Sequence, residues 1–377
     1  MVRMQRRLLL VALCLGACRS EPIAPGDGAA TPPSSGARLP GGDSAGSSGD
    51  GAPVTGGTPG ADEDPAGAVA GLTPSTDADG SGGVAGTPSA DAGSSGADVG
   101  ASSAPDAGVR LAPGSLAVSW MHGAPSCAQS TDPELQVHAY NATTYILRQD
   151  KCRTFEAPFV YLLLGAQTAL LLDTGATNSV GLRDTVLSLT GARSLLVAHS
   201  HAHADHVASD NRFRGQPGTT VVGTSLAAVQ QAFGFSPWPS DTAELDLGGR
   251  VLDVLAIPGH EQTHIALYDR ETGLLLTGDT LYPGLLFITD WTTYRASVRR
   301  LAAFVASHPV SHVLGAHIEM TSTARINYPY QTVYQPSEHV LQLDAAHVRE
   351  LDAALTALGA SPPAGPVALD DFVIDPQ

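Results

Sequence analysis

Four side chains that can bind metal ions lie within six residues of the sequence, between His201 and His206. They follow the pattern H-x-H-x-D-H, in which Asp205 and His206 are adjacent. Alternate side chains of an extended segment point the same way, so His201 and His203 can reach one metal ion together. Asp205 and His206 follow where we expect the chain to turn into a helix, and they can face a second metal ion. The alternative interpretation is a polar loop that contains histidines.

The segment just before the cluster, Ser194–Ala198, has the composition of a short buried strand. The cluster would then lie at the carboxyl end of a core strand, which is where layered α/β folds bind ligands. Three further strand ends offer His or Asp just after a small residue, and glycine at such a position lets the backbone approach closely. These are His260 after Val251–Ile257, Asp279 after Leu274–Thr277 and His317 after Ser311–Leu314.

These motifs together resemble the metallo-β-lactamase fold superfamily, over about residues 115–320. The matching motifs are Asp173 in L-L-D-T-G, the cluster His201, His203, Asp205 and His206, His260 in P-G-H, Asp279 in T-G-D-T-L, and His317 in G-A-H. The aspartate at position 279, rather than a cysteine or serine, is more similar to the glyoxalase II and lactonase branches than to true β-lactamases.

The resemblance implies two metal ions. One would be bound by His201, His203 and His260, and the other by Asp205, His206 and His317. Asp279 would bridge the two ions. By the same resemblance, Asp173 is a carboxylate behind the ligand histidines that fixes their orientation.

The chemistry of this ligand set is consistent with hydrolysis. Five imidazoles and two carboxylates suit two zinc ions best, with iron or manganese as alternatives. A metal ion lowers the pKa of bound water to near 7, so a metal-bound hydroxide can attack the carbonyl of an ester, thioester or lactone. We expect Asp205 to help orient this nucleophile. The substrate would be a small molecule.

Other histidines and aromatic residues have less specific surroundings. We interpret His264 as structural support and His199 as a satisfied loop or core histidine. The segment 328–339 is rich in tyrosine and proline and follows a ligand strand, so it is either a wall of the active site or a plain surface loop. Tyr282, Phe287, Trp291 and Trp238 could line a pocket or pack in the core.

Three alternative functions remain at this stage. They are a periplasmic β-lactamase, an enzyme with a single iron ion similar to persulfide dioxygenases, and a metal-binding surface module without catalysis. Glyoxalase II has a basic C-terminal domain that binds glutathione. Here Arg325 and Arg349 are the only basic residues after Arg300, which argues against glutathione thioesters.

The elements around the motifs alternate between hairpins and helices. Strand pairs are expected at 159–173, 242–257 and 265–277, and helices at 181–190, 225–233, 292–307 and 344–358. We also expect early strands at 117–120 and within 135–147, and the last strand at 311–314. This order favours a four-layer αββα sandwich of the α/β class over a doubly wound sheet. Asp344 and Gly359 are the expected ends of the closing helix.

The N-terminus has the pattern of an export signal. Arg3, Arg6 and Arg7 precede a short apolar run that ends in Leu15-Gly16-Ala17-Cys18, which resembles the bacterial lipobox. Cys18 would become the lipid-modified N-terminus of an exported protein anchored in the cell envelope, at the outer membrane or on the periplasmic side. An ordinary secretory signal is the alternative.

The composition divides the chain into three parts. Residues 1–18 form the signal, residues 19–110 a disordered linker of Gly, Ala, Ser, Pro and Asp, and residues 111–377 the folded domain. The linker has too few apolar residues to offset the loss of chain entropy on folding. The net charge of −17 and the single lysine, Lys151, argue against nucleic-acid binding. Composition does not predict the oligomeric state.

Cys127 and Cys152 flank the start of the folded part. In an exported protein such a pair is a disulfide candidate, and two unpaired thiols are the alternative.

Overall fold

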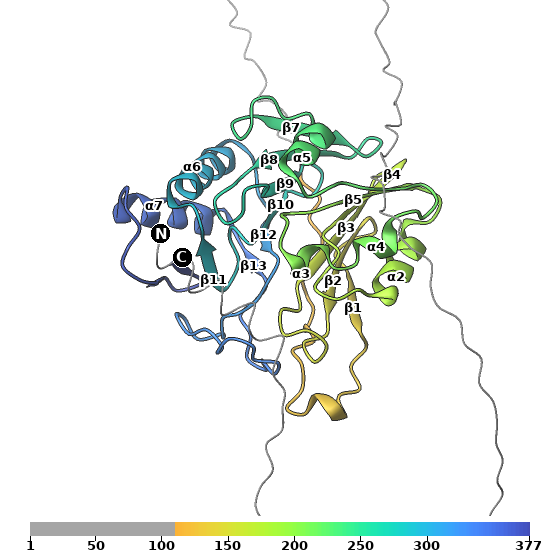
Figure 1. Ribbon diagram of the computed structural model, residues 1–377, viewed down its shortest axis with the longest axis horizontal. Coiled ribbons are helices and arrows are strands. Elements are labelled where there is room, and N and C mark those ends of the chain that lie inside the picture. Colours follow the sequence, from red (N-terminus) through yellow and green to blue (C-terminus); the bar gives the residue numbers. More distant parts are fainter. Residues whose placement is uncertain (1–109) are drawn as a thin grey trace, which may run out of the picture. The chain divides into compact units, whose positions relative to one another are not determined.

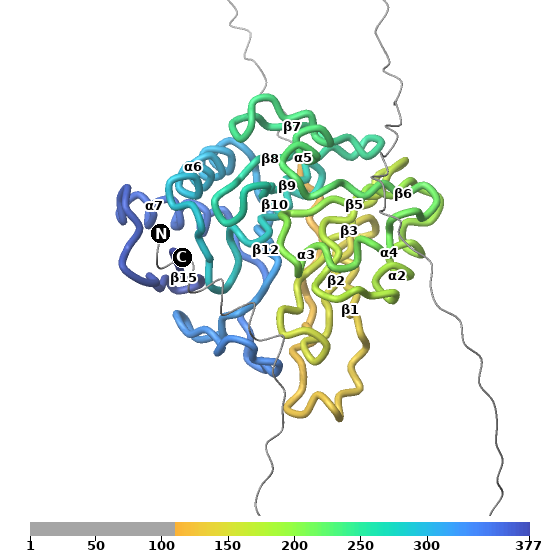
Figure 2. Tube along the Cα trace, in the orientation of Figure 1, coloured from red at the N-terminus to blue at the C-terminus, as the bar shows by residue number. Residues whose placement is uncertain are grey.

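The computed structural model describes residues 110–377, which lie within one compact unit. The expected signal with Cys18 and the linker up to residue 109 fall outside the described residues. Two six-stranded sheets face each other in this unit, and Figures 1 and 2 show helices beside both of them.

The first sheet has its strands in chain order. They are β1 (Leu135–Ala139), β2 (Thr144–Gln149), β3 (Phe159–Leu164), β4 (Thr168–Leu172), β5 (Ser194–Ala198) and β6 (Thr219–Val221). Strands β1, β2, β3 and β4 pair with one another in antiparallel fashion, whereas β5 pairs in parallel with β4 and β6 pairs in parallel with β5. The parallel step between β4 and β5 is made by helix α2 (Val180–Thr190).

The second sheet has the order β13-β12-β10-β9-β8-β7. Its strands are β7 (Thr242–Asp246), β8 (Val251–Ala256), β9 (Ile265–Asp269), β10 (Leu274–Gly278), β12 (His312–Gly315) and β13 (Gln342–Leu343). Strand β10 pairs in parallel with β12, and the crossover between them contains helix α6 (Trp291–Ser307).

Both sheets are covered on two faces, which explains their nearly continuous apolar sequences. In β4, Leu170 and Leu172 belong to the core between the sheets, whereas Ala169 and Leu171 face α2. Helices α6 and α7 (Ala345–Leu358) cover the outer face of the second sheet through a further core. The expected four-layer αββα sandwich is therefore confirmed.

Helix ends follow the sequence signals. Ser179 and Asp290 accept hydrogen bonds from backbone N–H groups in the first turns of α2 and α6. Asp344 forms a capping box with His347 at the start of α7, and the helix ends before Gly359, as expected. The remaining helices are α3 (Ala204–Val207), α4 (Asp210–Phe213), α5 (Leu226–Phe233) and the short 3-10 helix η1 (Cys127–Gln129).

Two expectations for the strands were wrong. Residues 117–120 form no strand, because Trp120 packs against the core between the sheets from an irregular segment. The strand at β12 is not the last, because β13 follows it and residues near the C-terminus form a third sheet. That sheet contains β11 (Leu285–Ile288), β15 (Val373–Pro376) and β14 (Val367–Ala368).

Two long-range connections tie the irregular segments to the sheets. Cys127 and Cys152 form a disulfide that closes a stretch of chain containing β1 and β2. Arg148 on β2 is fully buried, and both of its terminal nitrogens donate to the carboxylate of Glu338 at 2.6 Å. This pair fixes the segment between β12 and β13, which is blue in Figure 1. None of the helices between residues 110 and 377 combines the length and apolar character that a membrane crossing requires.

Candidate metal centre

Strand register brings the motif residues together. Leu172 of β4 pairs with Ala198 of β5, so the segments that follow these strands run side by side and lead to the histidine cluster. In the second sheet, Gly278 of β10 pairs with Gly315 of β12 after a register shift. This pairing places Asp279 beside the segment that carries His317. The centre therefore lies where the carboxyl ends of strands from both sheets meet.

The first group of potential ligands contains His201, His203, His260 and Asp279. The Nδ1 atom of His203 lies 3.0 Å from Nε2 of His201 and 3.1 Å from Nε2 of His260. Asp279 Oδ2 lies 3.7 Å and 3.6 Å from those two Nε2 atoms. Three ring nitrogens and one carboxylate oxygen thus converge on one point.

The second group contains Asp205, His206, His317 and again Asp279. Asp205 Oδ2 lies 3.3 Å from Nε2 of both His206 and His317. Asp279 reaches His206 through Oδ2 and His317 through Oδ1, at 3.5 Å in each case. Asp279 therefore belongs to both groups, and the two groups lie next to each other at its carboxylate.

The spacing and the unused atoms of both groups fit divalent metal ions. Tetrahedral ligands at about 2.0–2.1 Å from zinc are about 3.4 Å apart, close to the distances between these donor atoms. His206 Nε2 and Asp279 Oδ1 are buried and have no hydrogen-bond partner. An unpartnered buried polar atom is costly, and a metal ion would remove that cost.

Asp173 supports the histidine cluster from behind. Its carboxylate accepts from the backbone N–H of Ser200 at 2.7 Å and from the Ser200 hydroxyl at 2.9 Å. Its Oδ2 atom also lies 3.0 Å from His206 Nδ1, so a proton held there leaves Nε2 free to face the second group. Asp173 has a φ of 70°, a left-handed conformation that aspartate tolerates better than most residues.

Two more histidines are oriented by backbone carbonyls. His260 Nδ1 donates to the carbonyl oxygen of Phe287 at 2.7 Å, and His317 Nδ1 donates to that of Glu156 at 3.2 Å. Both hydrogen bonds direct Nε2 towards the centre. The sequence does not reveal these contacts, because a backbone carbonyl is available on every residue.

The carboxylates and histidines of the centre shift one another's pKa values. Burial opposes the ionisation of Asp205 and Asp279, yet the charges of His206 and His317 hold the pKa of both carboxyls far below its usual range. Against the effect of burial, Asp279 and Asp205 raise the pKa of His317 to about 9. Burial lowers the pKa of His201 well below its usual value. Ionised carboxylates beside ring nitrogens attract a cation that competes with protons.

His264 and His199 lie beside the centre without joining either group. The His264 ring stacks on that of His201, with centroids 4.8 Å apart, and its Nε2 accepts from the backbone N–H of Asp279 at 3.1 Å. His199 Nε2 lies 2.8 Å from Asp210 Oδ1. The structure thus agrees with the interpretation of His264 as structural support and of His199 as a satisfied histidine.

A small cavity of about 30 Å³ lies near His317, because its lining residues include Glu156, whose backbone carbonyl contacts His317 Nδ1. The aromatic segment after β12 forms one wall of it, including Tyr328 and Tyr330. Glu156 and Glu319 also line this cavity. Burial raises the pKa of both carboxyls, that of Glu156 to about 7, so a positive charge beside them would favour their ionised forms.

The two acids of this cavity were missed in the sequence. Glu319 lies two residues after His317, a spacing that puts two side chains on the same side of an extended segment. That signal was available in the sequence. Glu156 gives no such signal, because it is near the centre only through its backbone contact with His317.

The aromatic residues near Asp279 divide between the site and the core. Tyr282 contacts the ring of His317 edge to face, with centroids 5.6 Å apart. Trp291 donates to the carbonyl of Gly359 beside α7, and Trp238 contacts Phe235.

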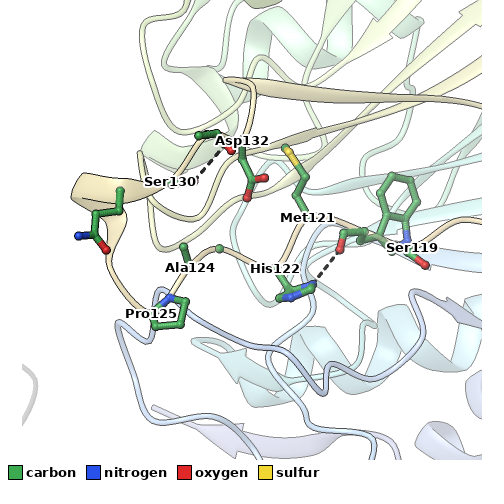
Figure 3. Close-up of a pocket in the computed structure, with 11 residues that line it drawn as sticks. Ser119, Met121, His122, Ala124, Pro125, Ser130 and Asp132 are labelled. Atoms are coloured by element: carbon green, nitrogen blue, oxygen red, sulfur yellow. Dashed lines mark hydrogen bonds between the residues drawn. The ribbon is translucent and has the colours of Figure 1, made fainter.

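A separate hollow, lined by residues 119–125 and 129–132, is shown in Figure 3 and contains none of the seven potential ligands.

Comparison with known proteins agrees with this geometry. Residues 153–317 match the family model of the Metallo-beta-lactamase superfamily. A hydroxyacylglutathione hydrolase of Aeromonas hydrophila is 29% identical over 192 residues, which are 50% of this chain and 70% of that protein. An acyl-coenzyme A thioesterase of Gallus gallus is 27% identical over 215 residues, which cover 44% of this chain and 74% of that protein.

Other similarities cover less of the compared protein or are weaker. A hydroxyacylglutathione hydrolase of a Synechococcus species is 32% identical over 132 residues, and the chain spans 50% of its length. A metallo-beta-lactamase structure from Pontibacter korlensis is 16% identical with a TM-score of 0.41, and covers 59% of this chain and 99% of that one.

The two facing sheets with their outer helices define a protein of the metallo-β-lactamase fold. Residues 153–317 are therefore similar to the metallo-β-lactamase superfamily, and the compared relatives of this chain are hydrolases. The expectation of an enzyme is thereby confirmed.

Proposed function

We propose that this protein hydrolyses small thioesters or esters with two divalent metal ions bound at one centre. The observation that carries the proposal is the pair of four-residue groups that share Asp279. A single shared carboxylate keeps two ions close together, which is the arrangement of two-metal hydrolases.

His201, His203 and His260 would hold one ion, and Asp205, His206 and His317 the other, with Asp279 bridging them. Divalent ions there would supply Lewis acidity and an activated water for attack on a carbonyl carbon. Five imidazoles and two carboxylates favour zinc, and iron or manganese can bind the same set.

The protein's own residues orient the ligand rings and are expected to orient an attacking water molecule. Asp173, Phe287 and Glu156 fix the ring positions of three ligand histidines through the contacts on Nδ1. Asp205 is the carboxylate of the second group with the larger exposure, because 23% of its side chain is open to solvent against 9% for Asp279. Asp205 is thus placed to accept a hydrogen bond from an attacking water and to orient it.

The relatives support a thioester as the reacting group, since two of their names describe thioester hydrolysis. Arg325 and Arg349 are the only basic residues after Arg300, which supports a substrate other than a glutathione thioester. Lactones contain the same kind of ester carbonyl, so they are included in the same substrate screen.

Metal analysis combined with a substrate screen tests the proposal. We expect purified protein to bind two metal ions per chain and to hydrolyse neutral thioesters faster than nitrocefin, a chromogenic β-lactam. One iron ion per chain with no hydrolysis of any ester, thioester or lactone would contradict it.

We also propose that the protein is exported and anchored through lipid on Cys18, so that the centre acts in the cell envelope. The lipobox-like sequence at Leu15–Cys18 supports this location. The Cys127–Cys152 disulfide also supports it, because such bonds persist in oxidising compartments.

A further inference from the structure

The ligand histidine His260 depends on a strand outside the two main sheets. Its Nδ1 atom donates to the carbonyl oxygen of Phe287 at 2.7 Å. Phe287 belongs to β11, which is only four residues long. Leu286 and Ile288 of this strand are buried in the core with α6 and α7, whereas Phe287 is partly exposed. The direction of the His260 ring therefore depends on what holds β11 in place.

The residues just after β11 are bonded to the turn that carries His260. The Thr289 hydroxyl lies 2.8 Å from the carbonyl oxygen of His260 and 3.0 Å from that of Gly259, and it can donate its proton to either. The backbone N–H groups of Thr289 and Asp290 both donate to the carbonyl of Gly259, at 3.0 and 2.9 Å. Thr289 therefore fixes the backbone path at His260 while Phe287 fixes its ring.

The last strand, β15, bonds to the opposite edge of β11. The N–H of Val373 donates to the carbonyl of Gly284 at 2.8 Å, and that of Gln377 donates to the carbonyl of Ile288 at 3.0 Å. Carbonyls of successive residues in a strand point to opposite edges, so that of Phe287 points away from β15 and towards His260. Among the described residues, β15 is the one strand that pairs with β11.

Strand β15 is itself firmly held. Ile374 and the preceding Phe372 are fully buried in the core that contains α6 and α7. Its other edge pairs with β14 in antiparallel fashion. The strand lies outside residues 153–317, which match the family model, so the match does not account for this support.

We infer that β15 and Thr289 position the metal ligand His260, with β15 acting through β11. The inference rests on the proposed two-metal hydrolysis, and it assigns a part in that centre to residues beyond the seven potential ligands. The second group is oriented by other contacts, from Asp173 to His206 and from Glu156 to His317. Loosening β11 should therefore weaken the first ion selectively.

Two ligand variants separate the ions so that each can be measured alone. His317→Ala removes a ligand of the second group, so the tight ion that remains reports on the first group, and His260→Ala does the reverse. Into each of these full-length variants we place Thr289→Val, which removes the hydroxyl and keeps the shape, or Val373→Pro, which removes the N–H donated to Gly284. Zinc affinity is measured by competition with a chelator.

We expect each substitution to lower zinc affinity about tenfold or more with His317→Ala and by less than about twofold with His260→Ala. Thr289→Ser keeps the hydroxyl and should keep the affinity. Thr220→Val, on the exposed face of β6, is the matched control and should change neither value. If Val373→Pro does not fold, Ile374→Ala replaces it, because it reduces the packing of the same strand.

A second measurement needs no metal ion. The Nδ1 proton of His260 is held by the Phe287 carbonyl, so metal-free protein should show a ring N–H resonance by NMR that is lost in His260→Ala. This proton should exchange faster with water in Thr289→Val and in Val373→Pro.

Equal losses of affinity in the two backgrounds, or no loss in either, overturn the inference. The proposed function stands in that case if the unsubstituted protein binds two zinc ions and hydrolyses thioesters. If the unsubstituted protein binds no divalent ion, the proposed function fails, and the inference fails with it.

Discussion

With one side chain, Asp173 contacts Ser200, which directly precedes the histidine cluster, and His206 within it. Its carboxylate holds the backbone and hydroxyl of Ser200 and also His206 Nδ1. Its left-handed backbone is tolerated by Asp, Asn and Gly, whereas a larger side chain there is strained. The residue therefore fixes both the path of the chain and the direction of one ligand ring.

The substitution Asp173→Asn should separate these two roles. Asparagine keeps the backbone conformation, but its amide group cannot accept from both Ser200 and His206 as the carboxylate does. We expect metal affinity to fall about 10- to 100-fold, measured by competition with a chelator. Asp184→Asn, on the exposed surface of α2, is the control. Equal affinities in the two variants would show that Asp173 has no part in orienting His206.

Asp279 and His260 should differ in their effect on metal content. His260→Ala removes a ligand from the first group only, so we expect about one tightly bound ion per chain after dialysis. Asp279→Ala removes a donor from both groups and should reduce the content of both ions. Elemental analysis of the purified variants measures the metal content per chain. His308→Ala, at the end of α6, is the control. Two ions retained in Asp279→Ala would exclude a bridging role.

At the scale of elements, the segment between β12 and β13 is attached to the first sheet by a buried ion pair. Arg148 has no exposed surface, and Glu338 is 8% exposed on its side chain. Arg148 also donates to the carbonyl of Met121, so one guanidinium connects β2, the N-terminal segment and the wall of the cavity.

Breaking this pair should destabilise the protein strongly. We expect Arg148→Met to lower the free energy of unfolding by about 3 kcal/mol, because it leaves the buried Glu338 carboxylate with only the more distant Lys151 ammonium, at 3.8 Å, as an ion-pair partner. The double variant Arg148→Met/Glu338→Gln should recover part of this loss. Arg183→Met, which breaks an exposed pair with Asp184, should cost less than about 1 kcal/mol. Denaturant unfolding of these three variants and of the unsubstituted protein tests the prediction, and similar losses for both arginines would refute it.

The sequence predicted the elements whose pattern is local. Apolar runs between turn residues indicated β3, β4, β8 and β10, and the positions of the seven potential ligands followed from their motifs. It did not predict β11, β14 and β15, because Val367–Ala368 and Val373–Pro376 become strands only through pairing with each other and with Leu285–Ile288. Likewise Glu156 approaches the centre only through tertiary contacts.

At the scale of the whole molecule, the proposed anchor depends on one residue outside the described part of the chain. A lipid chain on Cys18 would keep the folded domain with the membrane.

The substitution Cys18→Ala should release the protein from the membrane. We expect the unsubstituted protein to sediment with membranes and to enter the detergent phase on phase separation, whereas the variant enters the aqueous phase. Cys14→Ala, in the same apolar run, is the matched control and should stay with the membrane fraction. Identical partitioning of both variants with the unsubstituted protein would argue against lipid attachment at Cys18.

The potential ligands come from two consecutive stretches of chain, with the first sheet providing His201–His206 and the second providing His260, Asp279 and His317. A cut between α5 and β7 would therefore give two fragments, each with an incomplete set of ligands. Such fragments would then reassociate more strongly as the metal concentration rises. The free energy of association would become more favourable by about 1.4 kcal/mol for each tenfold increase in free ion above its dissociation constant. The same arrangement that serves hydrolysis thus makes the molecule a candidate split reporter for divalent metal ions.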